Sequence, residues 1–205
     1  MNIGASQLIK SSLAQLVYLN YKKKNRKVTK RQYTGNKYAE IKAKGLAQEL
    51  RGLISFKKFN LFFCIDAIKD KTGIEIKYVE DKYEDWYLYS SILQSIFYAS
   101  LINKVKYLDT PKFRIREGYT QVFHDLKEKP ITKFELWFGE SDKYTIKKSK
   151  KVYDYYIHKA KLFAKLSEMD DFNEAIYLAK KYDSTHKFQD WTILKKDIYS
   201  NFKLK

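Results

Sequence analysis

Three residues in the first half of the chain have types and spacing suited to metal-assisted phosphodiester chemistry. Asp66 ends the apolar run Phe62-Phe63-Cys64-Ile65, and Glu75 and Lys77 are two apart in an alternating run. Two neighbouring carboxylates raise each other's pKa unless a cation lies between them. Mg²⁺ suits such a pair, because it takes oxygen ligands from one or two carboxylates and from a substrate phosphate. A nearby lysine can orient the attacking water or help to deprotonate it.

A hairpin decides whether these three side chains meet. We expect the centre of its turn between Asp70 and Lys71. With that centre, Asp66 lies opposite Glu75 and shares a face of the sheet with it. Lys77 shares the face too, because alternate residues of a strand point the same way. A register shifted by one residue would separate the three. An ordinary surface hairpin with a cross-strand charge cluster is the alternative interpretation.

The helix after the hairpin adds two polar residues to the pattern. Gln94 and Tyr98 are four apart, so they lie on one face of a helix that is otherwise mainly apolar. A Gln in such surroundings needs a hydrogen-bond partner. A neighbouring active site or a phosphate would supply one, and a bound water is the alternative.

The elements that must position these residues alternate between helices and strands. Helices are predicted over residues 6–21, 37–53, 86–103, 148–166 and 172–182. Strands are predicted over residues 54–56, 61–68, 74–79, 105–108, 113–115 and 134–138. Gly35-Asn36 indicates a turn before the second helix, whose apolar stripe includes Ala39 and Ala43.

This order predicts an α/β fold in a single domain over residues 1–205. A basic N-terminal helix and loop occupy residues 1–34, the core occupies residues 35–140, and a helical C-terminal extension occupies residues 141–205. A single cysteine excludes a disulfide framework and a four-thiolate cluster within the chain. The three histidines are widely separated, which argues against a zinc site built from histidines. No apolar run reaches the ~18 residues of a membrane span, and no signal peptide is predicted, so we expect a cytoplasmic protein without a membrane partner.

The charge of the chain predicts a polyanionic partner. It has 41 Lys and Arg against 24 Asp and Glu, a formal net charge of +17. Each neutralised phosphate releases condensed counterions, so nucleic acid is the expected partner, with an anionic membrane or an acidic protein as alternatives. The residues expected to line a DNA path, with a solvated charged surface as the alternative, are Lys22, Lys23, Lys24, Arg26, Lys27, Lys30, Arg31, Arg114, Arg116, Lys147, Lys148, Lys150 and Lys151.

Asp66, Glu75-Ile76-Lys77 and Gln94-Ser95-Ile96-Phe97-Tyr98 together resemble motifs of the PD-(D/E)XK nuclease superfamily, in particular its RecB-type and phage exonuclease branch. That branch has, in order, a helical acidic residue or histidine, a strand Asp, a Glu/Asp-x-Lys strand and a Gln-x-x-x-Tyr helix. The resemblance covers about residues 35–108. It implies a restriction-endonuclease-like core, a central mixed β-sheet flanked by helices.

The resemblance also implies roles for these residues. Asp66, Glu75 and the Ile76 carbonyl would bind Mg²⁺, for which Mn²⁺ would substitute. Lys77 would serve the attacking water, and Gln94 and Tyr98 would position the scissile strand or the site itself.

The first motif is the one that matches least well. Relatives often have a histidine on the first helix, and this chain has none there. Glu40 and Glu49 are the candidates for the helical acidic ligand, nine residues apart and on opposite sides of the apolar stripe. We favour Glu40, because Ala39 and Ala43 leave room beside it.

The expected function is that of a magnesium-dependent DNA exonuclease that processes double-stranded ends in recombination, repair or replication. Small size and lysine richness favour a viral or mobile-element protein, which would act in the host cytoplasm. The alternatives are an endonuclease on the same fold (nicking, restriction-like or junction-cutting) and a non-catalytic DNA-binding protein. The pattern leaves open a homo-oligomer and a recombination partner protein.

Overall fold

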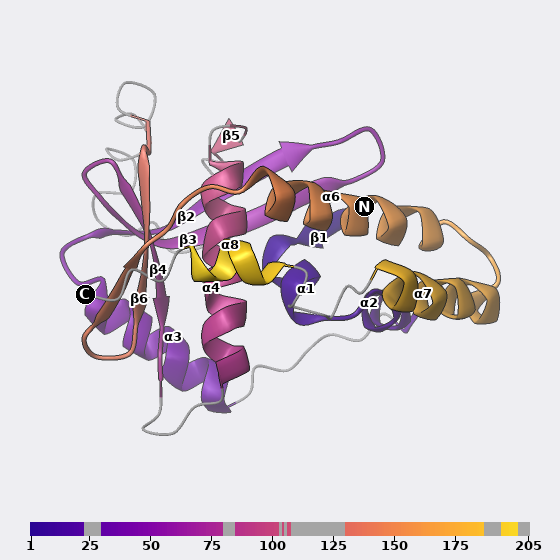
Figure 1. Ribbon diagram of the computed structural model, residues 1–205, viewed down its shortest axis with the longest axis horizontal. Helices are drawn as coiled ribbons and strands as arrows, with labels where there is room; N and C mark the ends of the chain where they lie inside the picture. The colour runs from indigo at the N-terminus through magenta and orange to yellow at the C-terminus, as the bar shows by residue number, and fades with distance from the viewer. Residues whose placement is uncertain are drawn as a thin grey trace.

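A mixed β-sheet with helices on both faces forms one half of the molecule, and further helices form the other half (Figure 1). The computed structural model describes residues 1–22, 30–79, 85–102, 104, 106–107, 130–186 and 194–200. The strands are β1 (Asn2–Gly4), β2 (Ala47–Ser55), β3 (Asn60–Lys69), β4 (Thr72–Lys77), β5 (Lys106–Tyr107), β6 (Lys133–Phe138) and β7 (Asp142–Thr145). The predicted α/β class, with a mixed sheet flanked by helices, is confirmed.

The strand order is β5-β2-β3-β4-β6-β7, and β1 pairs with β3 outside this path. Strands β2, β3 and β4 form an antiparallel meander, whereas β6 runs parallel to β4. A parallel pair requires a crossover connection, and α4 lies in the chain between β4 and β6. Neither β1 nor the short, largely exposed edge strand β7 was predicted from the sequence.

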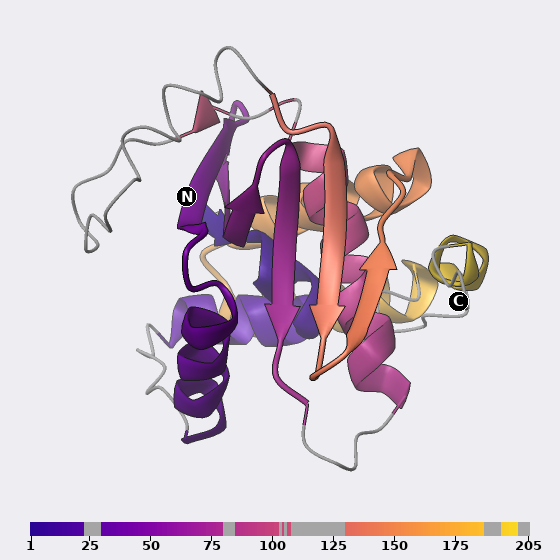
Figure 2. The ribbon, with the colours of Figure 1, turned by 90° about the vertical axis from the view of Figure 1, so that its left-hand side faces the viewer.

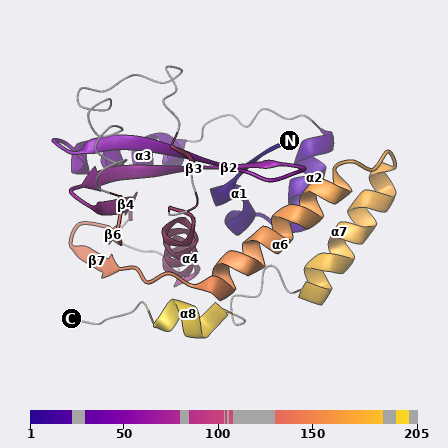
Figure 3. The same cartoon turned by 90° about the horizontal axis from the view of Figure 1, so that it is seen from above.

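The helices are α1 (Ala5–Lys10), α2 (Leu13–Tyr21), α3 (Lys30–Lys42), α4 (Asp85–Leu101), α6 (Lys150–Leu166), α7 (Phe172–His186) and α8 (Lys195–Tyr199). Helices α1 and α6 pack against α4, and α2 packs against α7, an arrangement visible from above (Figure 3). The N-terminal and C-terminal helices therefore form one layer on the α4 side of the sheet. None of the described helices is long and apolar enough to cross a membrane.

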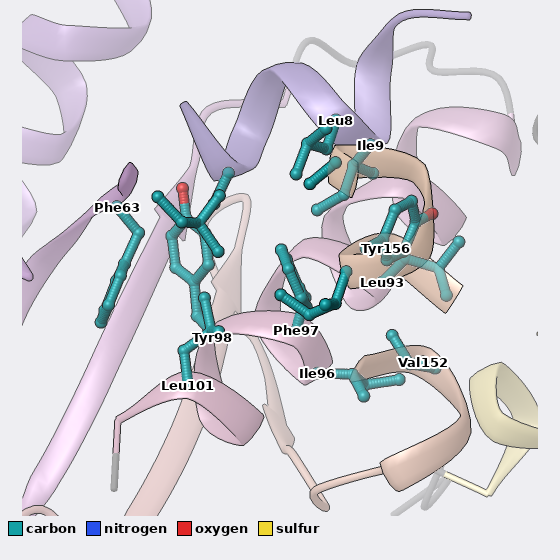
Figure 4. Close-up of a cluster of buried hydrophobic side chains, with 14 of the residues drawn as sticks. Leu8, Ile9, Phe63, Leu93, Ile96, Phe97, Tyr98, Leu101, Val152 and Tyr156 are labelled. Carbon is teal, nitrogen blue, oxygen red and sulfur yellow. The ribbon is translucent and has the colours of Figure 1, made fainter. Parts of the chain in front are cut away.

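The main core lies between the sheet, α4 and the layer of α1 and α6 (Figure 4). Phe97 of α4 is completely buried, and its ring centroid lies 5.2 Å from that of Tyr156 on α6. Phe63 of β3 contacts Tyr98 with a centroid distance of 5.3 Å. Apolar packing on nearly every side of α4 holds this helix at a defined position above the strands, and thereby positions its few polar residues.

The hairpin of β3 and β4 has the register predicted from its turn. Ala67 pairs with Ile74 and Lys69 with Thr72, so the turn is centred between Asp70 and Lys71. Asp70 has φ of 52°, a left-handed conformation that short polar side chains tolerate better than most residues. The two-residue turn thus determines which residues of the two strands face each other.

The helix predicted over residues 6–21 is two helices, α1 and α2, separated at Ser11 and Ser12. The Ser12 hydroxyl accepts a hydrogen bond from the Gln15 amide at 3.0 Å, and the Gln15 side chain accepts one from the Ser12 amide at 2.9 Å. This capping box begins a new helix inside the apolar pattern. The buried Lys159 ammonium donates to the carbonyls of Leu8 and Ser11 at 2.7 and 2.6 Å, which anchors the end of α1.

The helix predicted over residues 37–53 is confirmed only for residues 37–42, and its second part is wrong. Helix α3 ends at Lys42 and contains Gly35-Asn36, which we expected to form a turn, and residues 47–55 form β2. Gly45 has φ of 80° in the turn between them. The spacing of the apolar residues suits a helix, but pairing along nearly the whole of β3 satisfies the backbone of 47–55 as a strand, and tertiary pairing overrides local propensity.

The other predicted elements differ from the structure by a few residues at their ends, apart from those that lie outside the described residues. Helices α4, α6 and α7 and strand β6 match their predicted ranges closely, although α7 extends to His186. The predicted strand at 113–115, most of the basic loop and both Arg114 and Arg116 lie outside the described residues. The basic residues near the start of α6 are exposed, and Lys150 pairs with Asp154.

Candidate active site

Asp66 lies where the backbone ladder between β3 and β4 ends. The last paired residues are Ala67 and Ile74, and beyond them the Asp66 carboxylate accepts a hydrogen bond from the Ile76 amide at 2.7 Å. A side chain thus replaces a backbone carbonyl as partner of β4. This bond holds one oxygen of Asp66 at a defined position near the end of β4.

Glu75 is buried in the centre of the sheet, with only 2% of its surface exposed. Its Oε1 atom accepts hydrogen bonds from the Lys77 ammonium and from the Gln94 side-chain amide. Glu75 and Lys77 point the same way from β4, as residues two apart on a strand must, and this is the face covered by α4. The structure therefore brings Glu75 of β4 into contact with Gln94 of α4, although the two residues are 19 positions apart in the sequence.

Gln94 and Tyr98 lie on the face of α4 directed toward the sheet. The Gln94 amide lies 3.3 Å from the Tyr98 hydroxyl, and both residues are almost fully buried. The Tyr98 hydroxyl also bonds the Ser6 side chain of α1, toward which it points in Figure 4. Burial, then the charges of Glu75 and Asp66, raise the pKa of Tyr98 well above its usual value, so it remains a neutral phenol.

Two buried oxygens at this site have no hydrogen-bond partner among the residues that the structure describes. They are Oε2 of Glu75 and Oε1 of Gln94. A buried polar group without a partner costs about 1–3 kcal/mol, and more when it is charged. The two oxygens belong to side chains that are hydrogen-bonded to each other. Their presence indicates a site that is completed by a ligand able to accept electron pairs, such as a cation.

The charges at the site interact strongly. Burial, reinforced by the Asp66 carboxylate, raises the pKa of Glu75 to about 7, although Lys77 opposes the shift. Burial alone would lower the pKa of Lys77, but Glu75 and Asp66 outweigh it and raise that pKa above its ordinary value. Lys77 therefore stays an ammonium at neutral pH and acts as a fixed positive charge.

Lys10, at the end of α1, is a further residue of the site that sequence reasoning missed. Its side chain is accessible to solvent but has protein on its other sides, and this partial burial together with Lys77 lowers its pKa to about 8. Glu75 and Asp66 act on it in the opposite direction. Lys10 thus lies within electrostatic range of the cluster. No motif distinguished it from the many other lysines of the chain, because only the packing of α1 against α4 and β3 brings it near.

Glu40, the favoured helical ligand, is not brought to this cluster. It is exposed on α3, a helix whose residues Ala39 and Ala43 pack near Ile74 and Ile76. Those two isoleucines point away from Glu75, so α3 and α4 contact opposite faces of β4, and Figure 2 shows α4 behind the sheet. The structure therefore does not bring Glu40 together with Asp66 and Glu75.

The alternative residue, Glu49, is also not helical. It lies in β2, between positions that pair with Ala67 and Ile65 of β3. Its side chain is outside the described residues. The two glutamates do not share one helix, because the residues around Glu49 form strand β2.

A divalent cation with oxygen ligands fits the residues present. Asp66 and Glu75 supply two carboxylates, one with an unpartnered buried oxygen, and the Ile76 carbonyl lies on the strand between Glu75 and Lys77. Mg²⁺ is commonly held by one or two carboxylates and keeps several waters. Among the described residues there is no group of three or more His, Cys, Asp or Glu side chains that could hold a metal ion.

The arrangement combines two carboxylates, an ammonium and a buried amide at one end of a hairpin. Such a set can hold a cation beside a phosphate while a fixed positive charge offsets the charge that develops on the reacting group. Solvent reaches the cluster from the side of Lys77, which is 12% exposed. No protein-family model, curated protein or solved structure matches the chain.

Proposed function

We propose that this protein is a divalent-metal-dependent nuclease that hydrolyses phosphodiester bonds of DNA. The observation that supports this most directly is the pair of unpartnered buried oxygens on Glu75 and Gln94, next to Asp66 and Lys77. A purely structural charge cluster would be expected to satisfy its buried oxygens, because each one left unpaired destabilises the fold. A cation, together with the water molecules that it carries, would satisfy them.

Each residue of the site has a distinct role in this proposal. Asp66 and Glu75, with the Ile76 carbonyl, would hold Mg²⁺, which when bound supplies Lewis-acid polarisation of the phosphate and of water. Lys77 remains protonated beside Glu75, so it offsets negative charge on the phosphate and orients the attacking water. Gln94 keeps Glu75 in position, and Tyr98 connects Gln94 to Ser6 on α1.

The fold agrees with the resemblance of the motifs to the PD-(D/E)XK superfamily. The strand Asp, the Glu-x-Lys strand and the Gln-x-x-x-Tyr helix occur in the expected order, and a mixed sheet flanked by helices supports them. We therefore propose a restriction-endonuclease-like core and, from the same resemblance, an exonuclease acting on double-stranded ends in recombination, repair or replication. The formal net charge of +17 favours a nucleic-acid partner.

A nuclease assay on two forms of one plasmid tests the proposal. Linear DNA and covalently closed circular DNA are incubated with the full chain, with Mg²⁺, with Mn²⁺ and with a chelator. We expect progressive degradation of the linear form in either metal, no change of the circle, and no reaction with the chelator.

The same assay distinguishes the rival functions. Nicking of the closed circle would show an endonuclease and contradict the exonuclease assignment. Binding of DNA without cleavage in both metals would contradict the nuclease proposal and favour a DNA-binding protein. Cleavage that persists in the chelator would contradict the role of the metal.

A further inference from the structure

A groove runs along α2 beside α7, next to the end of α1. Its volume is about 620 Å³, and it opens to solvent along its length. The lining residues that matter are Lys10 at one end, Tyr18 of α2, and Lys180 and Ile176 of α7. The groove therefore combines cationic, aromatic and aliphatic side chains in one concave surface.

The side chains of the groove are available to a ligand. Tyr18 is 40% exposed even though its ring contacts Phe172 at a centroid distance of 6.3 Å, and Lys180 is exposed. Asp183, three residues beyond Lys180, has both carboxylate oxygens bonded to the amides of Leu13 and Ala14. The negative charge of Asp183 is therefore directed to the amides at the start of α2. The charged residues that line the groove are Lys10 and Lys180, so the groove surface is positive.

The groove comes near the candidate active site at Lys10, which lines the groove and interacts electrostatically with Glu75 and Asp66. This residue follows the segment of α1 whose Ser6 bonds Tyr98. The anchoring of α1 by Lys159 fixes that connection, because its bonds to Leu8 and Ser11 lie on either side of Lys10 in the chain. A strand bound in the groove would therefore contact a lysine on which the charges of Glu75 and Asp66 also act.

We propose that this groove binds a single strand of the DNA substrate, adjacent to the scissile bond, with phosphates on Lys10 and Lys180 and an unpaired base on Tyr18. The proposal rests on the proposed nuclease function and adds a substrate-binding site to it. Single-strand sites combine lysines that follow the backbone with aromatic rings on which bases stack. Stacking on Tyr18 requires an unpaired base, so the groove selects a single strand over a duplex.

Equilibrium binding without metal tests the proposal. A fluorescently labelled single-stranded oligonucleotide is titrated with the full chain in a chelator, and anisotropy is followed at several salt concentrations. We expect Lys180→Gln to weaken binding about 3- to 10-fold and to reduce the salt slope by roughly 0.7, the value for one phosphate contact on a single strand. We expect Tyr18→Leu to weaken binding at least about 5-fold.

Matched variants separate groove contacts from general charge. Lys181→Gln removes the same charge from the neighbouring exposed residue of α7, which does not line the groove, and should change affinity less than about 2-fold. Tyr18→Phe keeps the ring and should retain affinity, which also covers the case that Tyr18→Leu does not fold. Equal losses for Lys180→Gln and Lys181→Gln would overturn the proposal.

Two further ligands complete the test. Lys180→Gln and Tyr18→Leu should each weaken binding of a blunt duplex of the same length less than they weaken binding of the single strand. An equal loss for both ligands would overturn the single-strand assignment. Vesicles of anionic lipid should not distinguish Lys180→Gln from Lys181→Gln. If only vesicle binding depended on Lys180, the groove would be a membrane site and the proposal would fail.

These measurements are independent of cleavage. Absence of nuclease activity with intact groove-dependent binding would reject the proposed function while leaving a single-strand site. Cleavage that is unaffected by Lys180→Gln in both kcat and KM, with unchanged binding, would reject the groove while leaving the nuclease.

Discussion

The two faces of β4 are built from alternate residues and differ in every respect that matters for function. Ile74 and Ile76 point to one face, where they form a small apolar cluster with Ala43 and Ala67 under α3. Glu75 and Lys77 point to the other face, where they meet Gln94 of α4. One strand of six residues thus supplies both a packing surface and a charged site.

The comparison shows how apolar packing on one face offsets the destabilising effect of buried charges on the other. The apolar face contributes favourable burial, whereas the charged face leaves two oxygens without partners. Desolvated charges destabilise a fold unless they are paired and hydrogen-bonded. The surrounding packing must therefore hold the site together, and the two faces should respond to substitution in opposite ways: one in stability, the other in activity.

The largest expected effect is on activity at the charged face. Asp66→Ala and Lys77→Ala should each lower kcat/KM by at least about 10³-fold, because each removes a fixed charge beside the reacting phosphate. DNA affinity should stay within about 2-fold, since phosphate contacts elsewhere provide most of it. Single-turnover cleavage and anisotropy measure the two quantities. Unchanged cleavage in either variant would reject the site assignment.

A substitution on the apolar face should affect stability instead. Ile74 is completely buried. Ile74→Ala should lower the free energy of unfolding by about 2–5 kcal/mol, through lost burial and the cavity left behind. Urea unfolding measures this loss. Specific activity below the melting temperature should remain near that of the wild type, and a large loss of activity in a folded variant would contradict the separation of the two faces.

Glu75 should make the stability of the metal-free protein depend on pH. Its pKa is about 7 in the folded state against an ordinary value of 4.5, so the folded state binds more protons between those values. Stability should therefore fall as pH rises through this window, by up to about 3 kcal/mol in total. Thermal unfolding in a chelator at a series of pH values measures the trend.

Two comparisons make the assignment of that trend specific. Glu75→Gln should remove most of the pH dependence in this window. Millimolar Mg²⁺ at a pH above 7 should raise the melting temperature of the wild type and have little effect on Glu75→Gln, because a cation binds the ionised carboxylate. An equal effect of Mg²⁺ on both proteins would contradict a metal site at Glu75.

The smallest effect is expected at Glu40, on the α3 side of the sheet. Glu40→Gln should change kcat/KM less than about 2-fold and stability less than about 0.5 kcal/mol, as is usual for an exposed position away from a site. The cleavage assay used for Asp66→Ala provides the measurement. A loss of activity comparable to that of Asp66→Ala would show that the two faces of β4 cooperate in catalysis.

Local patterns were enough to predict the hairpin and the long helices. The turn at Asp70-Lys71 and the alternation in β4 depend on a few neighbouring residues, and the structure has the expected register. The apolar surroundings of Gln94 likewise indicated a buried helix that needs a polar partner. The prediction failed at residues 47–53, where an apolar spacing compatible with a helix belongs instead to a strand paired with β3.

The sequence alone determined which side chains of β4 share a face, because the period of a strand is two and a short turn sets the register. Only the tertiary structure decided which helices cover those faces, and hence that Lys10 rather than Glu40 approaches Glu75. That choice depends on packing between residues far apart in the chain, such as Lys159 against α1. No pattern within a single element contains this information, because long-range contacts become favourable only when the whole core assembles.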